Sequence, residues 1–285
     1  MKRFLVAIFF LLFAAGAAAG AAHPAIWKVQ GKNSTVYLIG SVHFLSPDLV
    51  WRDARMEAAI RAADVFYFET PLDGDAVKTY IATKGALPPG QSLHALLPPD
   101  SQSQLDEGLA SLGVLEPSVD TRRPWLVMIL MLGMQFQKAG LTTTGVDVAL
   151  AEEARMDGKP LRYFETIEQQ MALIAPDDRK LELESFESFL KDFKDEIKDI
   201  APMMDAWAAG DQTRLESLIM KDYADYPVLR KAMLDDRNKA WVKTLKAVLD
   251  QEHGTFLVTV GAGHLVGEQG VPALLREAGY AVTNP

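Results

Sequence analysis

The sequence predicts an α/β fold with a central, mostly parallel sheet built from two half-repeats and a large helical insertion. Two short apolar segments of strand character end in Gly-x-x-His, Tyr37–His43 (YLIGSVH) and Thr255–His264 (TFLVTVGAGH). A second pair ends in Phe-Glu-Thr, Asp64–Thr70 and Leu161–Thr166. β-Branched and aromatic residues favour buried strands. The doubled pattern predicts an internal duplication whose two halves contribute to one site.

The chain begins with a targeting segment. Lys2 and Arg3 precede the strongly apolar residues 4–13 and a run of small residues over 14–22. This order is typical of a cleavable secretory signal peptide, which we predict over residues 1–22. It implies a periplasmic or secreted protein. The alternative is an uncleaved anchor, which would make this segment the only contact with a membrane.

Composition restricts the remaining chain to an ordinary globular domain over residues 23–285. The sequence has no cysteine, which excludes disulfides, cysteine-ligated zinc and a lipoprotein anchor. It carries 29 basic and 38 acidic residues and no basic run, so we expect no nucleic-acid partner. With 49% hydrophobic residues, the chain can build a core large enough for stability.

The first half of the domain reads as β-α-β. Residues Ile26–Val29 and the following strand form a hairpin across a polar turn. Ser46-Pro47 predicts the start of a helix, with serine as the cap and proline in the first turn. The strand Asp64–Glu69 comes next, and a helix between two strands implies parallel pairing.

Two stretches between the strands have a helical pattern, at about 71–140 and 177–251. In the first, the apolar segment Trp125–Met134 is too short to cross a bilayer and predicts a buried helix. The elements expected in the second half are helix Gly145–Gly158 with Asp147 as its cap, strand Leu161–Glu165, a capping box at Thr166–Gln169, helix Val228–Gln251, strand Thr255–Val260, helix Pro272–Ala278 and strand Tyr280–Thr283.

The strand ends carry the residues that predict chemistry. Ligands bind outside the carboxyl ends of the strands in open α/β sheets, so His43, His264, Glu69 and Glu165 are expected to meet there. Imidazole and carboxylate are ligands for Zn, Mn, Fe or Co. We predict a divalent metal ion on His43, Glu69 and His264, with Glu165 as ligand or general base for a metal-activated water.

Asp236-Arg237-Asn238 provides two further candidates. Arg237 could stabilise a developing oxyanion or clamp a substrate carboxylate, and Asn238 could orient the water or the amide. The alternatives are a structural ion pair between Arg237 and a glutamate, and structural histidines at both strand ends. The sequence has no His-Glu-x-x-His and no Gly-x-Ser-x-Gly motif, so neither a zincin helix nor a nucleophile elbow is expected.

The same motifs, in this order, resemble the TraB/PrgY/GumN family, which is similar to the TIKI metalloproteases. The resemblance covers nearly all of the predicted mature chain. It implies an α/β fold and metal-dependent proteolysis, with His43 and His264 matching the family's first and second motif histidines and Glu69 matching the acid that follows the first. The motifs that carry the resemblance are LIGSVHF at Leu38–Phe44, Glu69, GVDVAL at Gly145–Leu150, YFETIEQQ at Tyr163–Gln170, DRN at Asp236–Asn238 and VGAGHLVG at Val260–Gly267.

Two functions from different classes follow. The first is an exported metal-dependent hydrolase, a peptidase or amidase acting on a peptide or protein substrate. The second is a non-catalytic protein of the cell envelope that captures and sequesters a peptide in a groove of the helical insertion. The first requires turnover that is sensitive to a chelator, whereas the second requires saturable binding without product.

Overall fold

The computed structural model describes residues 22–71, 74–142, 144–193, 196–224 and 226–285. Apart from Ala22, the segment predicted as a signal peptide lies outside these residues. The signal peptide therefore remains a prediction. Among the described residues, no helix combines the length and the apolarity that crossing a membrane requires.

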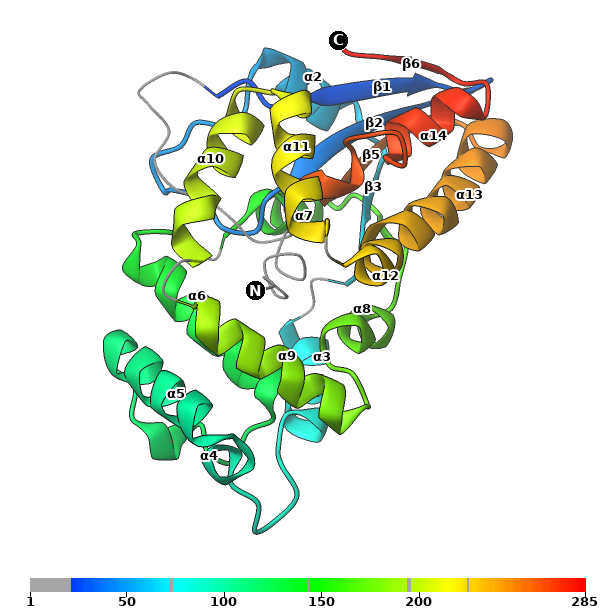
Figure 1. Ribbon diagram of the computed structural model, residues 1–285. Helices are drawn as coiled ribbons and strands as arrows, with labels where there is room; N and C mark the ends of the chain where they lie inside the picture. Colours follow the sequence, from blue (N-terminus) through cyan, green and yellow to red (C-terminus); the bar gives the residue numbers. More distant parts are fainter. Residues whose placement is uncertain (1–21, 72–73, 143, 194–195, 225) are drawn as a thin grey trace.

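The strands of the described chain form one mixed sheet in the order β4-β3-β5-β2-β1-β6 (Figure 1). The neighbours β4/β3, β3/β5 and β5/β2 are parallel, and β1 runs antiparallel to both β2 and β6. This confirms the predicted fold class. The strands are β1 Ile26–Gln30, β2 Ser34–Ser41, β3 Val65–Phe68, β4 Leu161–Tyr163, β5 Gly254–Gly261 and β6 Ala281–Thr283.

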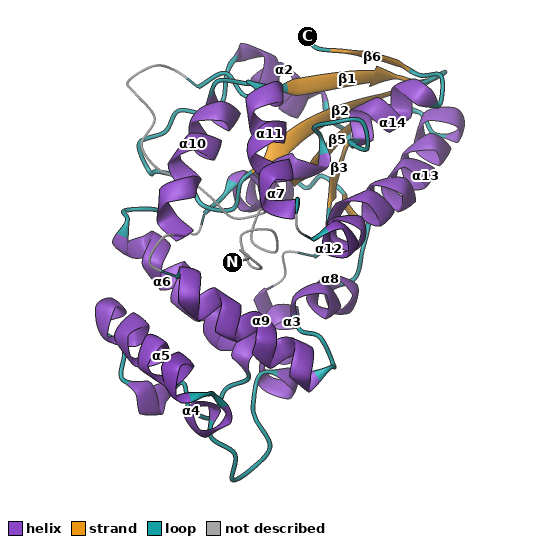
Figure 2. Ribbon diagram, viewed as in Figure 1, coloured by secondary structure: helices purple, strands orange, loops and turns teal. Residues whose placement is uncertain are grey.

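Helices flank the sheet, and helices joined by loops form the lower part of the molecule in the view of Figure 2. The short segment η2 is π-helical, and η1 and η3 are 3₁₀ turns. In chain order the helical segments are α2 Ala54–Ala62, α3 Gly74–Lys84, α4 Leu93–Leu96, α5 Pro99–Leu112, η1 Glu116–Ser118, α6 Pro124–Lys138, α7 Val146–Met156, α8 Ile167–Ile174, α9 Arg179–Asp192, α10 Glu196–Ala208, α11 Gln212–Tyr223, α12 Pro227–Arg230, η2 Lys231–Asp235, α13 Asp236–Gln251, η3 Ala262–His264 and α14 Val271–Glu277.

Strand side chains alternate between the two faces of the sheet, so each face presents its own apolar surface. Different helices cover the two surfaces. On one face, Leu38 and Val258 belong to a core cluster with Trp241 and Leu245 of α13 and Leu275 of α14. All five side chains are at most 2% exposed. This packing fixes α13, which carries the predicted Arg237 and Asn238, against the sheet.

The opposite face packs against α2 and α7. Ile39 and Leu257 of the sheet share a second core cluster with Ile60 of α2 and with Leu150 of α7. Apolar residues recur at helical spacing along both helices, as an amphipathic helix on a sheet requires. The first turn of α7 is thereby placed at the carboxyl edge of the sheet.

The helical lobe, formed by α3 to α6, α8 and α9, lies beyond that edge (Figure 1). The helix predicted over Trp125–Met134 is present as part of α6, but only one side of it is buried, since Leu130 and Met134 are exposed. The lobe therefore faces the strand ends at which the predicted site residues lie.

Two helix boundaries differ from the prediction. The helix expected from Ser46 begins at Ala54, because the Asp53 carboxylate accepts hydrogen bonds from the backbone N–H groups of Arg55 and Met56 and so caps the helix.

The last long helix also differs from the single helix expected. It starts at Pro227 and contains the π-helical turn Lys231–Asp235 before α13 begins at Asp236. Such a turn widens a helix locally and is frequent at functional sites.

Candidate functional site

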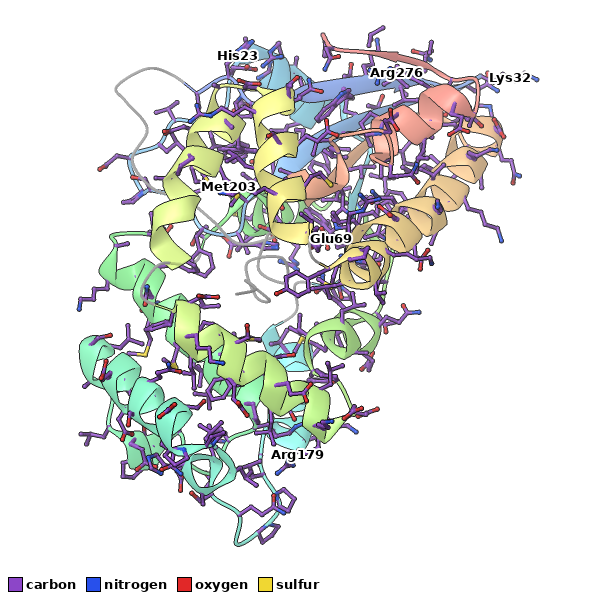
Figure 3. The ribbon with its side chains drawn as sticks, in the orientation of Figure 1. His23, Lys32, Glu69, Arg179, Met203 and Arg276 are labelled. Carbon is purple, nitrogen blue, oxygen red and sulfur yellow. The ribbon has the colours of Figure 1, made fainter. Side chains whose placement is uncertain are left out.

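Both Gly-x-x-His motifs reach the same edge of the sheet. The parallel pairing of β2 with β5 places Ser41 opposite Gly261, and His43 and His264 follow these residues by two and three positions. Glu69 follows β3 and lies between the sheet and the helical lobe (Figure 3). The predicted convergence at the strand ends is therefore present in the backbone topology.

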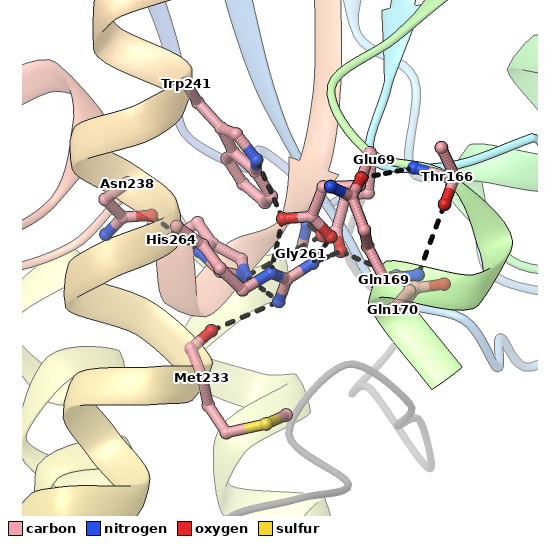
Figure 4. Close-up of polar contacts among 11 residues, drawn as sticks. Glu69, Thr166, Gln169, Gln170, Met233, Asn238, Trp241, Gly261 and His264 are labelled. Atoms are coloured by element: carbon pink, nitrogen blue, oxygen red, sulfur yellow. Dashed lines mark hydrogen bonds and ion pairs between the residues drawn. The ribbon is translucent and has the colours of Figure 1, made fainter. Parts of the chain in front are cut away.

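Arg237 is the centre of a buried network, and its partners Glu69, Met233 and His264 are labelled in Figure 4. Its Nε and Nη2 donate to Glu165 Oε1 and Oε2 at 2.8 and 3.0 Å, and Nη2 also donates to Glu69 Oε2 at 2.6 Å. Its Nη1 donates to Met233 O at 3.1 Å and lies 3.0 Å from His264 Nε2. Each of the five guanidinium N–H groups therefore has a partner. Arg237 has no donor left for a substrate in this arrangement.

Glu69 is satisfied on both oxygens. Oε1 accepts from Gly261 N at 2.6 Å, and Oε2 accepts from Gln170 Nε2 at 3.1 Å in addition to Arg237. The Glu165 backbone N–H donates to Glu69 O at 2.8 Å, which joins the two Phe-Glu-Thr motifs directly. These contacts hold a charged carboxylate whose side chain is only 7% exposed.

The electrostatics of the network fix the charges of Glu69 and His264. Burial raises the pKa of Glu69, but Arg237, His264, the Gly261 N–H and His43 outweigh it and hold the pKa at about 2. Burial and then Arg237 lower the pKa of His264 to about 3, although Glu69 opposes the shift. At neutral pH, Glu69 is therefore an anion and His264 a neutral imidazole.

His264 is held on three sides and is 0% exposed. Its Nδ1 lies 2.6 Å from Asn238 Oδ1, so Nδ1–H donates there and Nε2 accepts from Arg237. Asn238 Nδ2 in turn donates to Gln269 O at 2.8 Å. The Trp241 ring covers the imidazole, with centroids 4.4 Å apart. His264 and Asn238 are thus members of one sealed network.

Local sequence explains how Glu165 is positioned. Thr166 caps α8 by accepting from Gln169 N at 3.2 Å, and the Gln169 side chain accepts from Thr166 N at 2.9 Å (Figure 4). This is the predicted capping box. Because the helix start is fixed at Thr166, the preceding carboxylate is held where Arg237 and Trp241 can reach it.

His43 has a different environment. Its Nδ1 lies 2.6 Å from Asp147 Oδ2, and its side chain is 21% exposed. Burial lowers the pKa of His43, but attraction and a hydrogen bond to Asp147, with a further contribution from Glu69, outweigh burial and Arg237 and leave the pKa raised. His43 therefore lies within electrostatic reach of the network around Arg237 and, unlike His264, is open to solvent.

Asp147 was expected to cap α7, and this prediction is wrong. The N-cap is Gly145, which has no side chain to cap with, and Asp147 lies in the first turn of the helix against His43. A Cβ on Gly145 would collide with the His43 backbone and the Val42 carbonyl, while Val146 N donates to Val42 O at 3.0 Å. The glycine lets the helix start touch the first Gly-x-x-His motif.

The donor types at this edge suit a metal ion, but their arrangement does not fit one. His264 Nε2 and both oxygens of Glu69 are already hydrogen-bonded within the protein. The cation among them is Arg237. Within the described residues, no group of three or more histidine, aspartate or glutamate side chains is placed to hold a metal ion.

The predicted residues thus fall into two parts. One is the sealed network, and the other is His43 with its newly identified partner Asp147. In the sequence, Asp147 is recognisable only as an acid close to a glycine at the start of a helix. The same pattern is typical of a helix N-cap, so it does not identify Asp147 as the partner of His43. The members of the sealed network are Glu69, Glu165, Arg237, Asn238, Trp241 and His264.

Comparison with known proteins agrees with this arrangement of motifs. Residues 25–284 match the TraB/PrgY/gumN family. The chain belongs to this family. One relative is the "Uncharacterized protein YbaP" of Escherichia coli (strain K12), which is 26% identical over 255 residues, covering 89% of this chain and 92% of YbaP.

Two relatives in this family carry an activity in their names. "Metalloprotease TIKI1" of Danio rerio is 24% identical over 316 residues, covering 90% of this chain and 62% of TIKI1. "Metalloprotease TIKI2" of the same organism is 23% identical over 301 residues, covering 86% of this chain and 57% of TIKI2. No solved structure matches the chain. Distant similarity to TIKI metalloproteases suggests hydrolysis as the chemistry to consider.

Proposed function

We propose that this protein is a hydrolase that cleaves peptide or amide bonds, with His43 as the group that activates the attacking water. The observation that carries the proposal is the His43–Asp147 pair at the carboxyl edge of a parallel sheet. An imidazole that is oriented by a carboxylate on one nitrogen, and open to solvent, has the features of a general base. The names of TIKI1 and TIKI2 support the same reaction class.

The chemistry follows from the contact between His43 and Asp147. Because Asp147 accepts the Nδ1–H of His43, Nε2 is the proton acceptor in the neutral ring. Nε2 removes a proton from water while the water oxygen adds to the substrate carbonyl carbon. The proton then passes to the leaving nitrogen as the C–N bond breaks, giving a carboxylic acid and an amine, and the acid then loses its proton to the amine.

The residues of the sealed network carry out no chemical step in this proposal. The guanidinium donors of Arg237 are all occupied by protein partners, and the amide nitrogen and oxygen of Asn238 each have one protein partner. Their roles as oxyanion stabiliser and water-orienting group remain predictions that require these bonds to rearrange. The divalent metal on His43, Glu69 and His264 also remains a prediction, and no step of the proposed reaction passes through it.

The proposed place of action is the periplasm or the outside of the cell. The support is the sequence of the predicted signal segment, residues 1–22, with its basic start and apolar stretch. Comparing the N-terminus of the exported protein with that of the full chain tests this part separately from the enzymology.

The proposed activity is tested by incubating a peptide library with the protein and reading products by mass spectrometry, with and without EDTA. Replacing His43 by alanine should lower turnover of any cleaved peptide by about 10²- to 10⁴-fold. His94→Ala is the matched control, because His94 also pairs with an aspartate, Asp106, at 3.4 Å but does so in the helical lobe. Unchanged turnover in the His43 variant would refute the proposal.

A peptide-sequestering protein is the second candidate. An apolar groove of about 840 Å³, including its open mouth, lies in the helical lobe between α3, α5 and α6 and is lined by residues such as Leu109, Leu130 and Met134. Leu130 and Met134 are 44% and 37% exposed. Retention of particular peptides without any product in the library experiment would favour this function over hydrolysis.

A further inference from the structure

The network around Arg237 resembles a metal site in its donors but contains an organic cation. Two carboxylates, Glu69 and Glu165, and one neutral imidazole, His264, surround the guanidinium. Carboxylate oxygen and imidazole nitrogen are common protein ligands for zinc, manganese and iron. The side chains are also nearly sealed from solvent, at 7% exposure for Glu69, 12% for Glu165 and 0% for His264.

Each of these three donors approaches the guanidinium closely. The distances from its nitrogen atoms are 2.6 Å to Glu69 and 2.8 and 3.0 Å to Glu165, while Nη1 lies 3.0 Å from His264 Nε2. The imidazole is already in the tautomer that presents the Nε2 lone pair, because Asn238 holds Nδ1–H. A metal-binding histidine is normally oriented by such a hydrogen bond on its other nitrogen.

We infer that Arg237 is a built-in cation that takes the place of a metal ion, and that removing its side chain uncovers a latent divalent-cation site made of Glu69, Glu165 and His264. The inference is independent of the proposed hydrolysis, since it concerns which cation binds and makes no claim about turnover.

The intact chain should bind no metal ion at these three residues. A metal ion there would meet the permanent positive charge of Arg237, whose guanidinium also occupies the lone pairs that would bind the ion. Moving Arg237 away would leave a buried guanidinium without its partners, and such a change is costly. Removing Arg237 reverses the situation, because two buried carboxylates then lack a counter-charge and a divalent ion can supply it.

The chain offers a matched control in a second buried arginine pair. Arg123 Nη2 donates to Glu182 Oε2 at 2.9 Å, and these side chains are 14% and 2% exposed. Arg123 also donates to Pro176 O at 2.8 Å. Its partners comprise one carboxylate and a backbone carbonyl, with no imidazole among them. Removing this arginine should therefore uncover no metal site.

The experiment measures bound metal in the full chain after incubation with Zn²⁺ or Mn²⁺ and removal of free ions. Wild type and Arg123→Ala should retain almost no metal ion, whereas Arg237→Ala should retain about one ion per chain. Adding His264→Ala to Arg237→Ala should remove that ion. Isothermal titration should show at least about tenfold tighter binding to Arg237→Ala than to wild type.

Two results would overturn the inference. The first is a wild-type chain that retains about one ion and loses it on His264→Ala, because that ion would share the site with Arg237. The second is an Arg237→Ala chain that is folded by circular dichroism but gains no ion.

A variant that fails to fold does not leave the inference untested. In that event the thermal unfolding midpoint of the wild type decides, measured in EDTA and with added Zn²⁺ or Mn²⁺. An unchanged midpoint supports the inference. A rise that disappears in His264→Ala contradicts it, because an ion that binds the folded chain at this site must raise the midpoint.

Discussion

The two histidines that end the Gly-x-x-His motifs leave neighbouring parallel strands, yet their surroundings differ in almost every respect. His43 has a carboxylate partner, Asp147, a raised pKa and a side chain that is 21% exposed. His264 has an amide and a guanidinium as partners, a pKa of about 3 and no exposed surface. The first is suited to exchanging protons with solvent or substrate, and the second is suited to holding its neighbours in place.

The repeated Gly-x-x-His motif fixes the position of each histidine at the sheet edge without fixing its function. Both copies bring an imidazole to the sheet edge, but the helix that meets each one decides its charge. The α7 helix contributes the acid Asp147, which stabilises a proton on His43. The α13 helix contributes Arg237, which disfavours a proton on His264. The same side chain is thus a candidate base at one strand end and a neutral acceptor at the next.

Arg237→Met should have the largest effect and would test the structural half of the comparison. It leaves Glu69 and Glu165 without their buried counter-charge, so the free energy of unfolding should fall by about 3–5 kcal/mol. Urea denaturation at pH 7 in EDTA measures the loss. Arg61→Met is the control, because Arg61 is 70% exposed and lies 3.6 Å from Glu57, and it should cost less than about 1 kcal/mol. Equal losses in the two variants would contradict the assignment.

Asp147→Asn tests the catalytic half. Asparagine keeps the size of the side chain but cannot supply the charge that stabilises protonated His43, so kcat should fall on the order of 10²-fold with little change in KM. The steady-state parameters on any peptide cleaved by the wild type measure this. Asp106→Asn, beside His94, is the matched control and should leave both parameters unchanged. A loss confined to KM would mean that Asp147 shapes binding instead.

The sequence predicted the backbone of the site well. Short apolar runs rich in β-branched and aromatic residues predicted the strands on which the site is built, and parallel pairing then required their carboxyl ends to share one edge. Five of the six predicted residues lie in a single contact network, because three of them follow these strands and α13, which packs on the sheet, brings Arg237 and Asn238 to the same edge. Local patterns also predicted the Thr166 capping box, which depends on two residues three positions apart.

Partner choice could not be predicted in the same way, because it depends on packing between distant segments. Asp147 has the local features of a helix cap, and its contact with His43 spans more than a hundred residues of chain. Arg237 was considered both as a catalytic group and as a glutamate partner, and its five donor contacts become countable only once α13 is packed against the sheet. The sequence identifies the ionisable groups, whereas tertiary structure determines their pairings.

The pH dependence of the unfolding free energy should test the difference between the two histidines from the side of His264. The pKa of folded His264, about 3, lies below its ordinary value of 6.5, so between these values the unfolded chain binds more protons. The contribution of His264 to the free energy of unfolding is therefore complete above pH 6.5 and is lost as pH falls. The loss should be about 1–2 kcal/mol between pH 7 and pH 5. Arg237 and Glu69 are the charges facing His264. Urea denaturation of wild type and His264→Asn should show a smaller drop in the variant, and equal drops would contradict a neutral buried imidazole.

The smallest effect is expected where the network meets the start of α8. Thr166→Ala removes the acceptor for Gln169 N and should cost about 1 kcal/mol of unfolding free energy, because a helix N-terminus loses one satisfied donor. Thr83→Ala is the control, since Thr83 is exposed near the end of α3 and donates only to carbonyls of its own helix. It should be neutral or slightly stabilising. A Thr166→Ala loss as large as that of Arg237→Met would mean that the cap, through Glu165, is itself required to hold the sealed network together.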